Sequence, residues 1–330
     1  MKALVIGLGS MGKRRVRNLR ALGIADVSGV DPREDRRAEA ASTYSIRVFR
    51  DVDSALGESE PDCAIISTPP DQHMGYAFRM ADRRIPCFIE ASVVDAGRIL
   101  KLHEQTRAGG PIMAPSCTMR YFPGPQKVKA LVNSGAIGRV VSINYQTGQY
   151  LRDWHPWEQI QDFYVSRRAT GGCREIVPFE LTWLNDIFGP PEPVACLRER
   201  VGDLDVDIDD IYHCLLRYPG NVTANVTVEV LSRPFATREL RVLGTLGQIV
   251  WSAGEHAIRV AATGSDDWTR HELDQGTAQS GYINPEEPYI AELRDFISAV
   301  QTGDAGKFPN SLLADHAVLS ILDGLERKSV

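Results

Sequence analysis

The first third of the chain alternates short, continuously apolar runs with amphipathic segments. The runs cover residues 3–7, 26–31, 63–68 and 87–91. Such runs are typical of parallel strands that are buried on both faces. The segments at 13–22, 33–42 and 73–82 have helical spacing of apolar positions. This alternation predicts a doubly wound α/β sheet, completed by a strand at 111–117.

The pattern changes near residue 118. A helix-like segment at 124–135 precedes long β-rich runs at 139–151, 209–219, 221–232, 237–252 and 257–262. Pro219-Gly220 and the pair Gly244 and Gly247 are turn signals between such runs, which favours hairpins and meanders. Helices are expected at 288–301 and 311–327. We therefore predict an α/β domain at 1–118 and, at 119–330, an α+β domain with a large, mostly antiparallel open sheet.

Composition narrows the possible partners. The 330 residues are 43% hydrophobic and 24% charged, as in a folded protein, and the net charge of -6 favours neither nucleic acid nor an anionic membrane. No apolar stretch has the length of a membrane span, and the apolar start is too short for a signal peptide. The six cysteines form no C-x-x-C pair. They are expected to be reduced, mostly buried thiols of a cytoplasmic protein.

Gly7, Gly9 and Gly12 form a G-x-G-x-x-G fingerprint directly after the first strand and before the first helix, with Ser10 and Met11 between the last two glycines. The first glycine permits a tight turn, the second lets the backbone approach a pyrophosphate, and the third allows close helix–strand packing. The helix N-terminus then faces the anion. These features predict a dinucleotide site.

Asp31, at the end of the second strand, lies 19 positions after Gly12. A carboxylate there accepts hydrogen bonds from the ribose hydroxyls and repels a 2′-phosphate, which favours NAD over NADP. Arg33, Arg36 and Arg37 follow closely and can offset that repulsion, so NADP stays possible. Arg33 is included in the predicted coenzyme site. Asp31 can also serve as a helix N-cap ahead of Pro32.

Several motifs in this order resemble the glucose-fructose oxidoreductase and inositol dehydrogenase family, Gfo/Idh/MocA. They are the fingerprint, "STPPDQH" at 67–73, Glu90, "RYFPGPQKVKALVNSGAIG" at 120–138 and "EPYIAELRDFISAV" at 287–300. The resemblance implies a Rossmann domain, then an α/β domain whose open sheet often supports oligomer contacts. It implies oxidation or reduction of a sugar, inositol or related polyol with NAD(P), in a homodimer or homotetramer.

Thr68 and Pro69 form a rigid turn at the carboxyl end of a predicted parallel strand, where ligands of open α/β sheets bind. We expect Thr68, Pro69 and His73 to line the coenzyme, although His73 is equally suited to a helix start satisfied by backbone or solvent. Glu90 is expected on the cofactor side of the site.

Two positions depart from the family pattern. The usual Glu-Lys-Pro is Glu90-Ala91-Ser92 here, so the proton-transferring Lys is missing. In the segment after Gly171-Gly172, Phe179 aligns with the family's His and Thr182 with its Asp. A register shift of one residue places Glu180 at the His position. Phe179 and Glu180 are included among the predicted substrate-binding residues, and neither supplies an imidazole.

The segment 150–164 carries the candidate replacements. Trp154 and Trp157 offer flat faces for a sugar ring, and His155 or Tyr164 is the predicted proton relay. Asp153 and Glu158 are further hydroxyl-binding candidates. The alternative is that the tryptophans fill a core or an interface and His155 caps a turn.

Charged residues elsewhere complete the predicted substrate site. Arg174, with Glu175 as its partner, either clamps an anionic group or forms a buried ion pair that orients a helix. Arg120, beside Tyr121, either lines the cleft or holds the domain joint. Asp209 and Asp210 are expected to cap a turn, and no metal site is predicted.

Three functions are compatible with this pattern. The first is an NAD-dependent oxidoreductase acting on a sugar, nucleotide sugar or polyol in a cleft between the domains. The second is a coenzyme-binding partner or sensor subunit without turnover. The third is a redox-neutral enzyme that uses tightly held NAD to modify a sugar. Fold alone does not decide among them.

Overall fold

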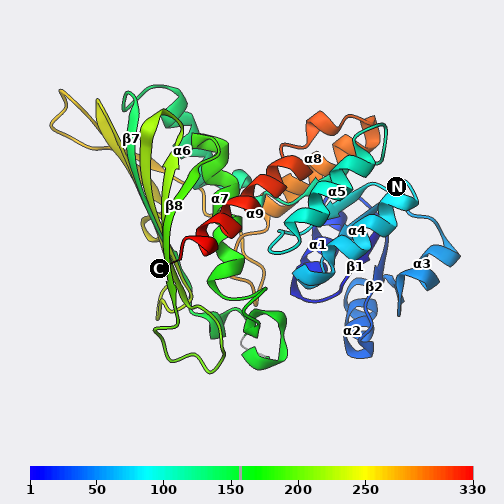
Figure 1. The fold of residues 1–330 in the computed structure, drawn as a ribbon. Coiled ribbons are helices and arrows are strands. Elements are labelled where there is room, and N and C mark those ends of the chain that lie inside the picture. Colours follow the sequence, from blue (N-terminus) through cyan, green and yellow to red (C-terminus); the bar gives the residue numbers. More distant parts are fainter. Residues whose placement is uncertain (156–157, 330) are drawn as a thin grey trace. The chain divides into compact units, whose positions relative to one another are not determined.

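The computed structural model describes residues 1–155 and 158–329. Contacts group the chain into two compact units (Figure 1). Unit 1 comprises Met1–Thr118 and Gly276–His316, and unit 2 comprises Met119–Gln275 and Ala317–Val330. Among the described residues, no helix is long and apolar enough to cross a membrane.

Unit 1 contains a six-stranded parallel sheet in the order β3-β2-β1-β4-β5-β6. Its strands are β1 (Lys2–Ile6), β2 (Asp26–Val30), β3 (Arg47–Phe49), β4 (Cys63–Ile66), β5 (Cys87–Ile89) and β6 (Met113–Pro115). The helices between them are α1 (Ser10–Ala21), α2 (Glu34–Tyr44), α3 (Val52–Glu58), α4 (His73–Asp82) and α5 (Ala96–Thr106). Side chains of the central strands, such as Val5, Ile65 and Phe88, are fully buried. The predicted doubly wound α/β sheet is confirmed.

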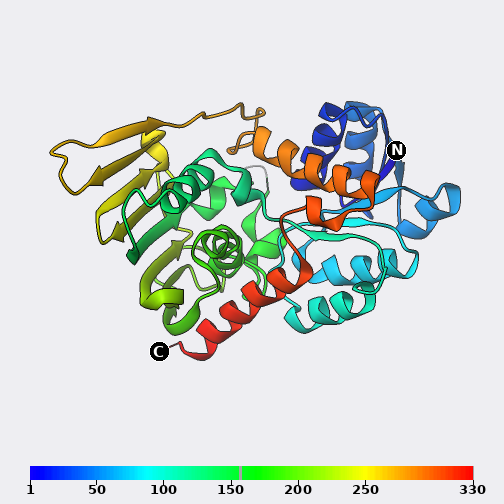
Figure 2. The ribbon, with the colours of Figure 1, turned by 90° about the horizontal axis from the view of Figure 1, so that it is seen from above.

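Unit 1 also includes a segment from near the end of the chain. Helix α8 (Glu287–Thr302) lies beside α1 (Figures 1 and 2). The sequence analysis placed residues 276–316 in the second domain, whereas the structure groups them with unit 1. The physical reason is a set of buried ion pairs and hydrogen bonds that α8 makes with α1 and with residues 116–118.

Unit 2 is organised around an eight-stranded sheet in the order β14-β13-β12-β11-β7-β10-β9-β8. The strands are β7 (Val140–Gly148), β8 (Glu192–Glu199), β9 (Ile211–Tyr218), β10 (Val222–Glu229), β11 (Thr237–Gly244), β12 (Gly247–Ser252), β13 (Ala257–Ala262) and β14 (Thr269–Glu272). All neighbouring strands are antiparallel except β7 and β10, so the predicted mostly antiparallel sheet is confirmed. Strands β8 and β14 were missed; most residues of both are partly or fully exposed, and β14 contains no apolar residue.

One face of this sheet is covered by α6 (Pro123–Asn133) and α7 (Cys173–Phe188). Trp183 of α7 meets Tyr145 and Trp251 edge-on, with ring centroids 5.3 and 5.9 Å away. Gly124 of α6 packs so closely on Trp251 that a Cβ there would collide with the indole. The opposite face carries exposed apolar side chains from three strands: Leu197, Leu215 and Leu243. The chain's last helix is α9 (Leu312–Arg327).

The cysteines are distributed over both units. All six are free and buried, which confirms the predicted burial. Burial raises the pKa of Cys63 to about 12, so this thiol is unreactive at neutral pH.

Candidate functional site

The glycine loop of unit 1 has the backbone geometry of an anion cradle. Gly7 has φ +93°, and a Cβ on it would lie 2.5 Å from the carbonyl oxygen of Ser67. A Cβ on Gly12 would collide with the carbonyl oxygen of Gly7. Gly9 is the N-cap of α1, and the first turn of this helix contains no acidic residue. The free N–H groups and the positive end of the helix dipole therefore face the loop, which suits a pyrophosphate.

Asp31 lies beside the glycine loop and binds its backbone at Leu8. Its side chain is buried and accepts hydrogen bonds from the backbone N–H groups of Leu8 and Arg33, each with a donor–acceptor distance of 2.9 Å. The N-cap of α2 is Arg33 rather than Asp31, and the Arg33 guanidinium pairs with Asp35 at 2.5 Å. Asp31 is thus held in a fixed orientation at the end of β2, as recognition of ribose hydroxyls requires.

Two buried polar atoms at the carboxyl end of β4 have no hydrogen-bond partner among the described residues. They are Oγ1 of Thr68 and Nδ1 of His73. The other ring nitrogen of His73 lies 2.8 Å from the Thr68 carbonyl oxygen, and burial lowers the pKa of this histidine. Buried polar groups are nearly always satisfied, so these atoms indicate a ligand. With the glycine loop, they fit a dinucleotide.

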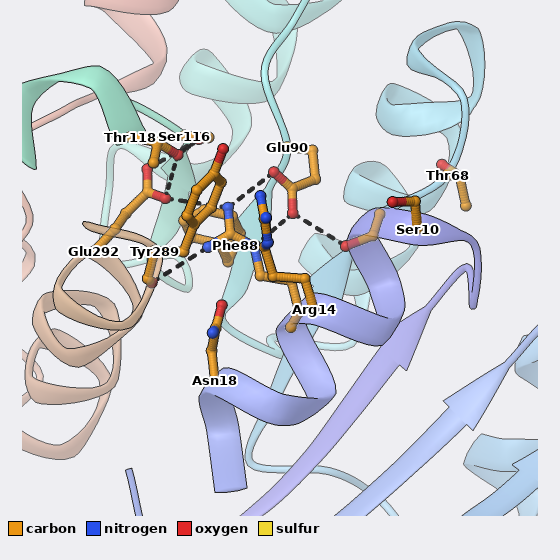
Figure 3. Close-up of polar contacts among 12 residues, drawn as sticks. Ser10, Arg14, Asn18, Thr68, Phe88, Glu90, Ser116, Thr118, Tyr289 and Glu292 are labelled. Carbon is orange, nitrogen blue, oxygen red and sulfur yellow. Dashed lines mark hydrogen bonds and ion pairs between the residues drawn. The ribbon is translucent and has the colours of Figure 1, made fainter. Parts of the chain in front are cut away.

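Glu90, at the end of β5, is held by an ionic network (Figure 3). Arg15 of α1 binds both of its carboxylate oxygens, at 2.6 and 2.9 Å, and Ser67 donates a hydrogen bond at 3.2 Å. Arg15 also reaches Glu292 of α8 at 3.1 Å. The guanidinium lies 4.5 Å from the centroid of the Phe88 ring. Glu90 is therefore a fixed anion beside the predicted coenzyme site.

Glu292, the residue of α8 that takes part in this network, is completely buried. Glu292 accepts hydrogen bonds from Ser116 and Thr118 side chains and from the backbone N–H of Cys117, over 2.6–2.9 Å. Burial raises the pKa of Glu292, with Arg15 opposing that rise. Burial alone would lower the pKa of Arg15, but Glu90 and Glu292 outweigh it and hold that pKa above its usual value.

Sequence analysis did not identify Arg15 or Glu292. The signal was present, because Arg15 falls on the same helical stripe as Gly12, Val16 and Leu19. Glu292 likewise falls on the buried stripe of Tyr289, Leu293 and Phe296. A charge on an apolar stripe is expected to have a buried partner.

In unit 2, Tyr164 and Glu175 form a partly buried pair. Tyr164 donates a hydrogen bond to Oε1 of Glu175 over 2.7 Å. The other carboxylate oxygen, Oε2, is buried and has no hydrogen-bond partner among the described residues. Burial raises the pKa of Glu175 to about 7, and the hydrogen bond from Tyr164 offsets part of that rise. Such a carboxyl can gain or lose a proton at neutral pH.

Two glycines bring this pair together. Gly172 adopts φ +60° and precedes the first residue of α7. A Cβ on Gly171 would collide with the carbonyl group of Val165, the residue after Tyr164. The Gly-Gly turn therefore lets residues 164–166 pack directly against the first turn of α7, where Glu175 lies.

His155 lies in the same segment as Tyr164. Its Nδ1 is 3.2 Å from the Glu158 carboxylate, and its ring stacks on Phe163 with centroids 4.7 Å apart. Phe163 in turn meets the Tyr164 ring edge-on at 6.0 Å. The structure therefore joins the two predicted relay residues through one phenyl ring. Trp154 is partly exposed, and Trp157 lies outside the described residues.

The predicted pairing of Arg174 with Glu175 is wrong. Arg174 pairs with Glu326 at 2.8 Å and with Asp323 at 3.5 Å, both on α9. Consecutive residues on a helix point in directions about 100° apart, so neighbours in sequence do not face each other. Arg174 thus anchors α7 to the last part of α9, while Glu175 points to Tyr164.

Two of the remaining predicted substrate residues, Glu180 and Arg120, have polar partners within unit 2. Glu180 is completely buried and accepts hydrogen bonds from Tyr145, Trp183 and Arg238 over 2.6–2.7 Å, so its charge is satisfied within unit 2. Arg120 donates to the carbonyl oxygen of Thr182 at 3.2 Å. Phe179 is partly exposed. No cluster of metal-ligating side chains occurs among residues 1–155 and 158–329.

Two family models match the chain and together cover more than half of it. An oxidoreductase family with an NAD-binding Rossmann fold matches residues 1–106, and the GFO/IDH/MocA C-terminal domain matches residues 126–250. The chain belongs to the Gfo/Idh/MocA family. Unit 1 therefore carries the NAD-binding Rossmann domain of this family of oxidoreductases.

Sequence relatives in the Gfo/Idh/MocA family include two kinds of dehydrogenase. Trans-1,2-dihydrobenzene-1,2-diol dehydrogenase of Oryctolagus cuniculus is 24% identical over 67% of this chain and 65% of its own length. Inositol 2-dehydrogenase of Acidothermus cellulolyticus is 30% identical over 41% of each chain. The matches therefore span less than two thirds of these relatives.

Solved structures of similar fold cover the whole chain. An oxidoreductase from Agrobacterium radiobacter, in complex with NAD⁺, L-tartaric acid and magnesium, has a TM-score of 0.86 at 16% identity, covering 100% of this chain and 96% of that one. Levoglucosan dehydrogenase in complex with NADH has a TM-score of 0.83 at 18% identity, with the same coverage. At these identities the likeness concerns the fold.

Proposed function

We propose that this Gfo/Idh/MocA protein is an NAD-dependent dehydrogenase of a sugar or related polyol, in which Tyr164 and Glu175 move the proton. The hydrogen-bonded pair of Tyr164 and Glu175 carries the proposal. The usual Lys position holds Ala91, and the usual His position holds Phe179 or, with the alignment shifted by one residue, Glu180. The names of the relatives, an inositol dehydrogenase and a levoglucosan dehydrogenase, support the substrate class.

When bound, the nicotinamide coenzyme supplies the hydride acceptor or donor. Oxidation of a secondary alcohol also releases the hydroxyl proton. Because Tyr164 donates its own proton toward Glu175, its oxygen keeps lone pairs that can accept the proton of the substrate hydroxyl. As that proton arrives, the phenolic proton passes to Glu175, and carbonyl reduction uses the reverse path. The carboxylate thus ends protonated, which its raised pKa favours.

Residues of unit 1 hold the coenzyme in this proposal. The glycine loop and the N-terminus of α1 bind the pyrophosphate, and Asp31 binds the ribose. Thr68 and His73 use their unpartnered atoms to bind the coenzyme, and Glu90 provides a fixed charge near it. Pro69, Ser10 and Met11 contribute the surrounding surface.

Segment 150–164 supplies the proposed substrate contacts. Trp154 and His155 face the sugar in this proposal, with Phe163 holding the His155 ring in place. A homodimer or homotetramer stays a prediction, for which the exposed apolar face of the unit 2 sheet is the candidate contact surface.

The test measures coenzyme turnover with a panel of polyols and keto-sugars. The change in NADH absorbance is the readout. Wild type is expected to reduce NAD⁺ with at least one polyol, and Tyr164→Phe to lose about 10²-fold or more in kcat while keeping its NADH affinity. NADH binding without any turnover would instead favour a sensor or partner subunit. Product formation without net NADH change would favour a redox-neutral sugar-modifying enzyme.

A further inference from the structure

Two of the buried cysteines face each other across neighbouring strands of unit 2. Cys196 lies on β8 and Cys214 on β9, and the antiparallel register places them directly opposite. The two residues are 1% and 0% exposed. Opposite residues of an antiparallel pair point to the same face of the sheet. The two sulfur atoms therefore lie side by side in the interior of unit 2.

The backbone of Cys196 shows which kind of strand pair this is. Its N–H donates to the carbonyl oxygen of Lys328 over 3.4 Å, on the side of β8 away from β9. Opposite residues whose N–H groups point away from each other form the non-hydrogen-bonded pair, in which the Cα atoms are about 4.5 Å apart. Disulfides join residues with Cα separations of about 4.4–6.8 Å. The spacing of the two strands therefore suits a disulfide.

The two thiols differ in how readily they ionise. The hydrogen bond with Cys214 lowers the pKa of Cys196, although burial opposes this. Arg198 also lowers that pKa, whereas Glu326 and Asp209 raise it. The same hydrogen bond, together with burial, raises the pKa of Cys214. Because the thiolate is the form that attacks an oxidant, Cys196 is suited to react first.

The place of β8 in the sheet also favours a reaction at Cys196. This strand ends the order of the eight-stranded sheet. On its outer side, Ser329 forms an isolated bridge with Cys196. A contact of so few hydrogen bonds opens locally at a much lower free energy than global unfolding requires. A small oxidant can then reach this edge while β8 and β9 stay paired.

We infer that Cys196 and Cys214 are a redox modification site, which hydrogen peroxide converts into a reversible disulfide between β8 and β9. The Cys196 thiolate attacks one peroxide oxygen, so that an S–O bond forms, the O–O bond breaks and hydroxide leaves. The Cys214 sulfur then displaces the oxygen of this sulfenic acid, which leaves as water with the Cys214 proton. The thiols are oxidised and the peroxide is reduced. A dithiol reductant restores both thiols by exchange.

Mass spectrometry tests the site on the folded, reduced full chain. The chain is treated with a small molar excess of hydrogen peroxide, alkylated with iodoacetamide in denaturant and digested with trypsin. Cleavage after Arg174, Arg198 and Arg200 leaves Cys173, Cys196 and Cys214 on separate peptides. The expected product is a peptide pair joined through Cys196 and Cys214, which dithiothreitol separates. The Cys196 thiol should be lost at least about tenfold faster than the Cys63 thiol.

Cys63 and Cys87 are the matched control within the same chain. They lie on the neighbouring strands β4 and β5, but Cys87 is opposite Ala64. Since successive residues of a strand point to opposite faces, the thiols of Cys63 and Cys87 point away from each other. No bridge between them is expected in the folded chain.

Single variants assign the two roles. Cys214→Ser lacks the second thiol, so peroxide should leave a sulfenic acid at Cys196 that dimedone labels. Cys196→Ser should give no such label at Cys214. Thermal melting verifies that each variant folds, and the measurement on wild type needs neither variant.

Other results would overturn the inference. They are thiols that all survive peroxide in the folded wild type, a bridge from Cys214 to Cys173, and a bridge between Cys63 and Cys87 in equal yield. A bridge between two chains, seen as a dimer on a non-reducing gel, would also overturn it. Dimedone on Cys214 instead of Cys196 would refute the order of attack.

Discussion

Tyr164 donates a hydrogen bond over 2.7 Å to Glu175, and the other oxygen of that carboxylate is buried with no hydrogen-bond partner among the described residues. Buried polar atoms in proteins nearly always have a hydrogen-bond partner, so this carboxylate oxygen is an exception. The pKa of Glu175, about 7, follows from that burial. This relationship leads to two predictions about pH.

The first concerns activity. In the direction of alcohol oxidation, wild-type kcat/KM is expected to rise with pH through about 7, because only the ionised Glu175 accepts the proton from Tyr164. Glu175→Gln is expected to abolish this limb of the profile and to lower kcat about 10²-fold. Initial rates between about pH 5 and 9 measure both effects. An unchanged midpoint in Glu175→Gln would assign the ionisation to another group.

The second concerns stability. The pKa of Glu175 rises from 4.5 in the unfolded chain to about 7 in the folded protein. Its contribution to stability is therefore fully present below 4.5 and is lost as pH rises through 7. Glu175→Gln, which carries no charge, should gain in Tm relative to wild type at about pH 8 and not at about pH 4. Calorimetry at both pH values checks this, and an equal Tm difference at the two would contradict it.

Arg15 links α1 to β5 and α8 through Glu90 and Glu292. Arg15→Met would leave Glu292 buried without its cation, so we expect a loss of about 3–5 kcal/mol in the free energy of unfolding. Arg107→Ala is the control, since its pair with Glu104 at 2.9 Å is 62% and 50% exposed and is expected to contribute less than about 1 kcal/mol. Denaturant melts measure both, and similar losses would refute a stabilising role for the buried network.

Gly12 has no room for a side chain. Gly12→Ala would force a Cβ onto the carbonyl oxygen of Gly7, so the loop must shift and NADH affinity should fall about tenfold or more. Gly57→Ala in α3 is the matched control, because a Cβ there meets nothing within 4 Å. Fluorescence titration with NADH compares them. Full affinity in Gly12→Ala would remove the glycine loop from the binding site.

His155 stacks on the phenyl ring that also meets Tyr164. His155→Ala is expected to cut turnover at least about tenfold, as the relay segment loses this contact and a polar group facing the substrate. His256→Asn, at an exposed position with φ +51°, serves as the control and should keep full activity. A fully active His155→Ala would exclude His155 from the mechanism.

The sequence predicted those features that depend on local pattern. Buried β-branched runs alternating with amphipathic segments determined the parallel sheet of unit 1, and turn glycines determined the hairpin between β11 and β12. The fingerprint with Asp31 pointed to the coenzyme, because backbone geometry at glycine is a local property. Most of the predicted substrate residues stay predictions.

Partners across long sequence separations were decided by tertiary structure alone. Arg174 and Glu175 are adjacent in sequence, yet one faces Glu326 and the other Tyr164. The return of residues 276–316 to unit 1 depends on Glu292 meeting Arg15, 277 positions earlier in the chain. Periodicity shows which face of a helix is buried, whereas the identity of the facing group depends on how distant segments pack. The pKa of Glu175 is likewise a property of its surroundings, since it is the folded chain that removes water from this carboxyl group.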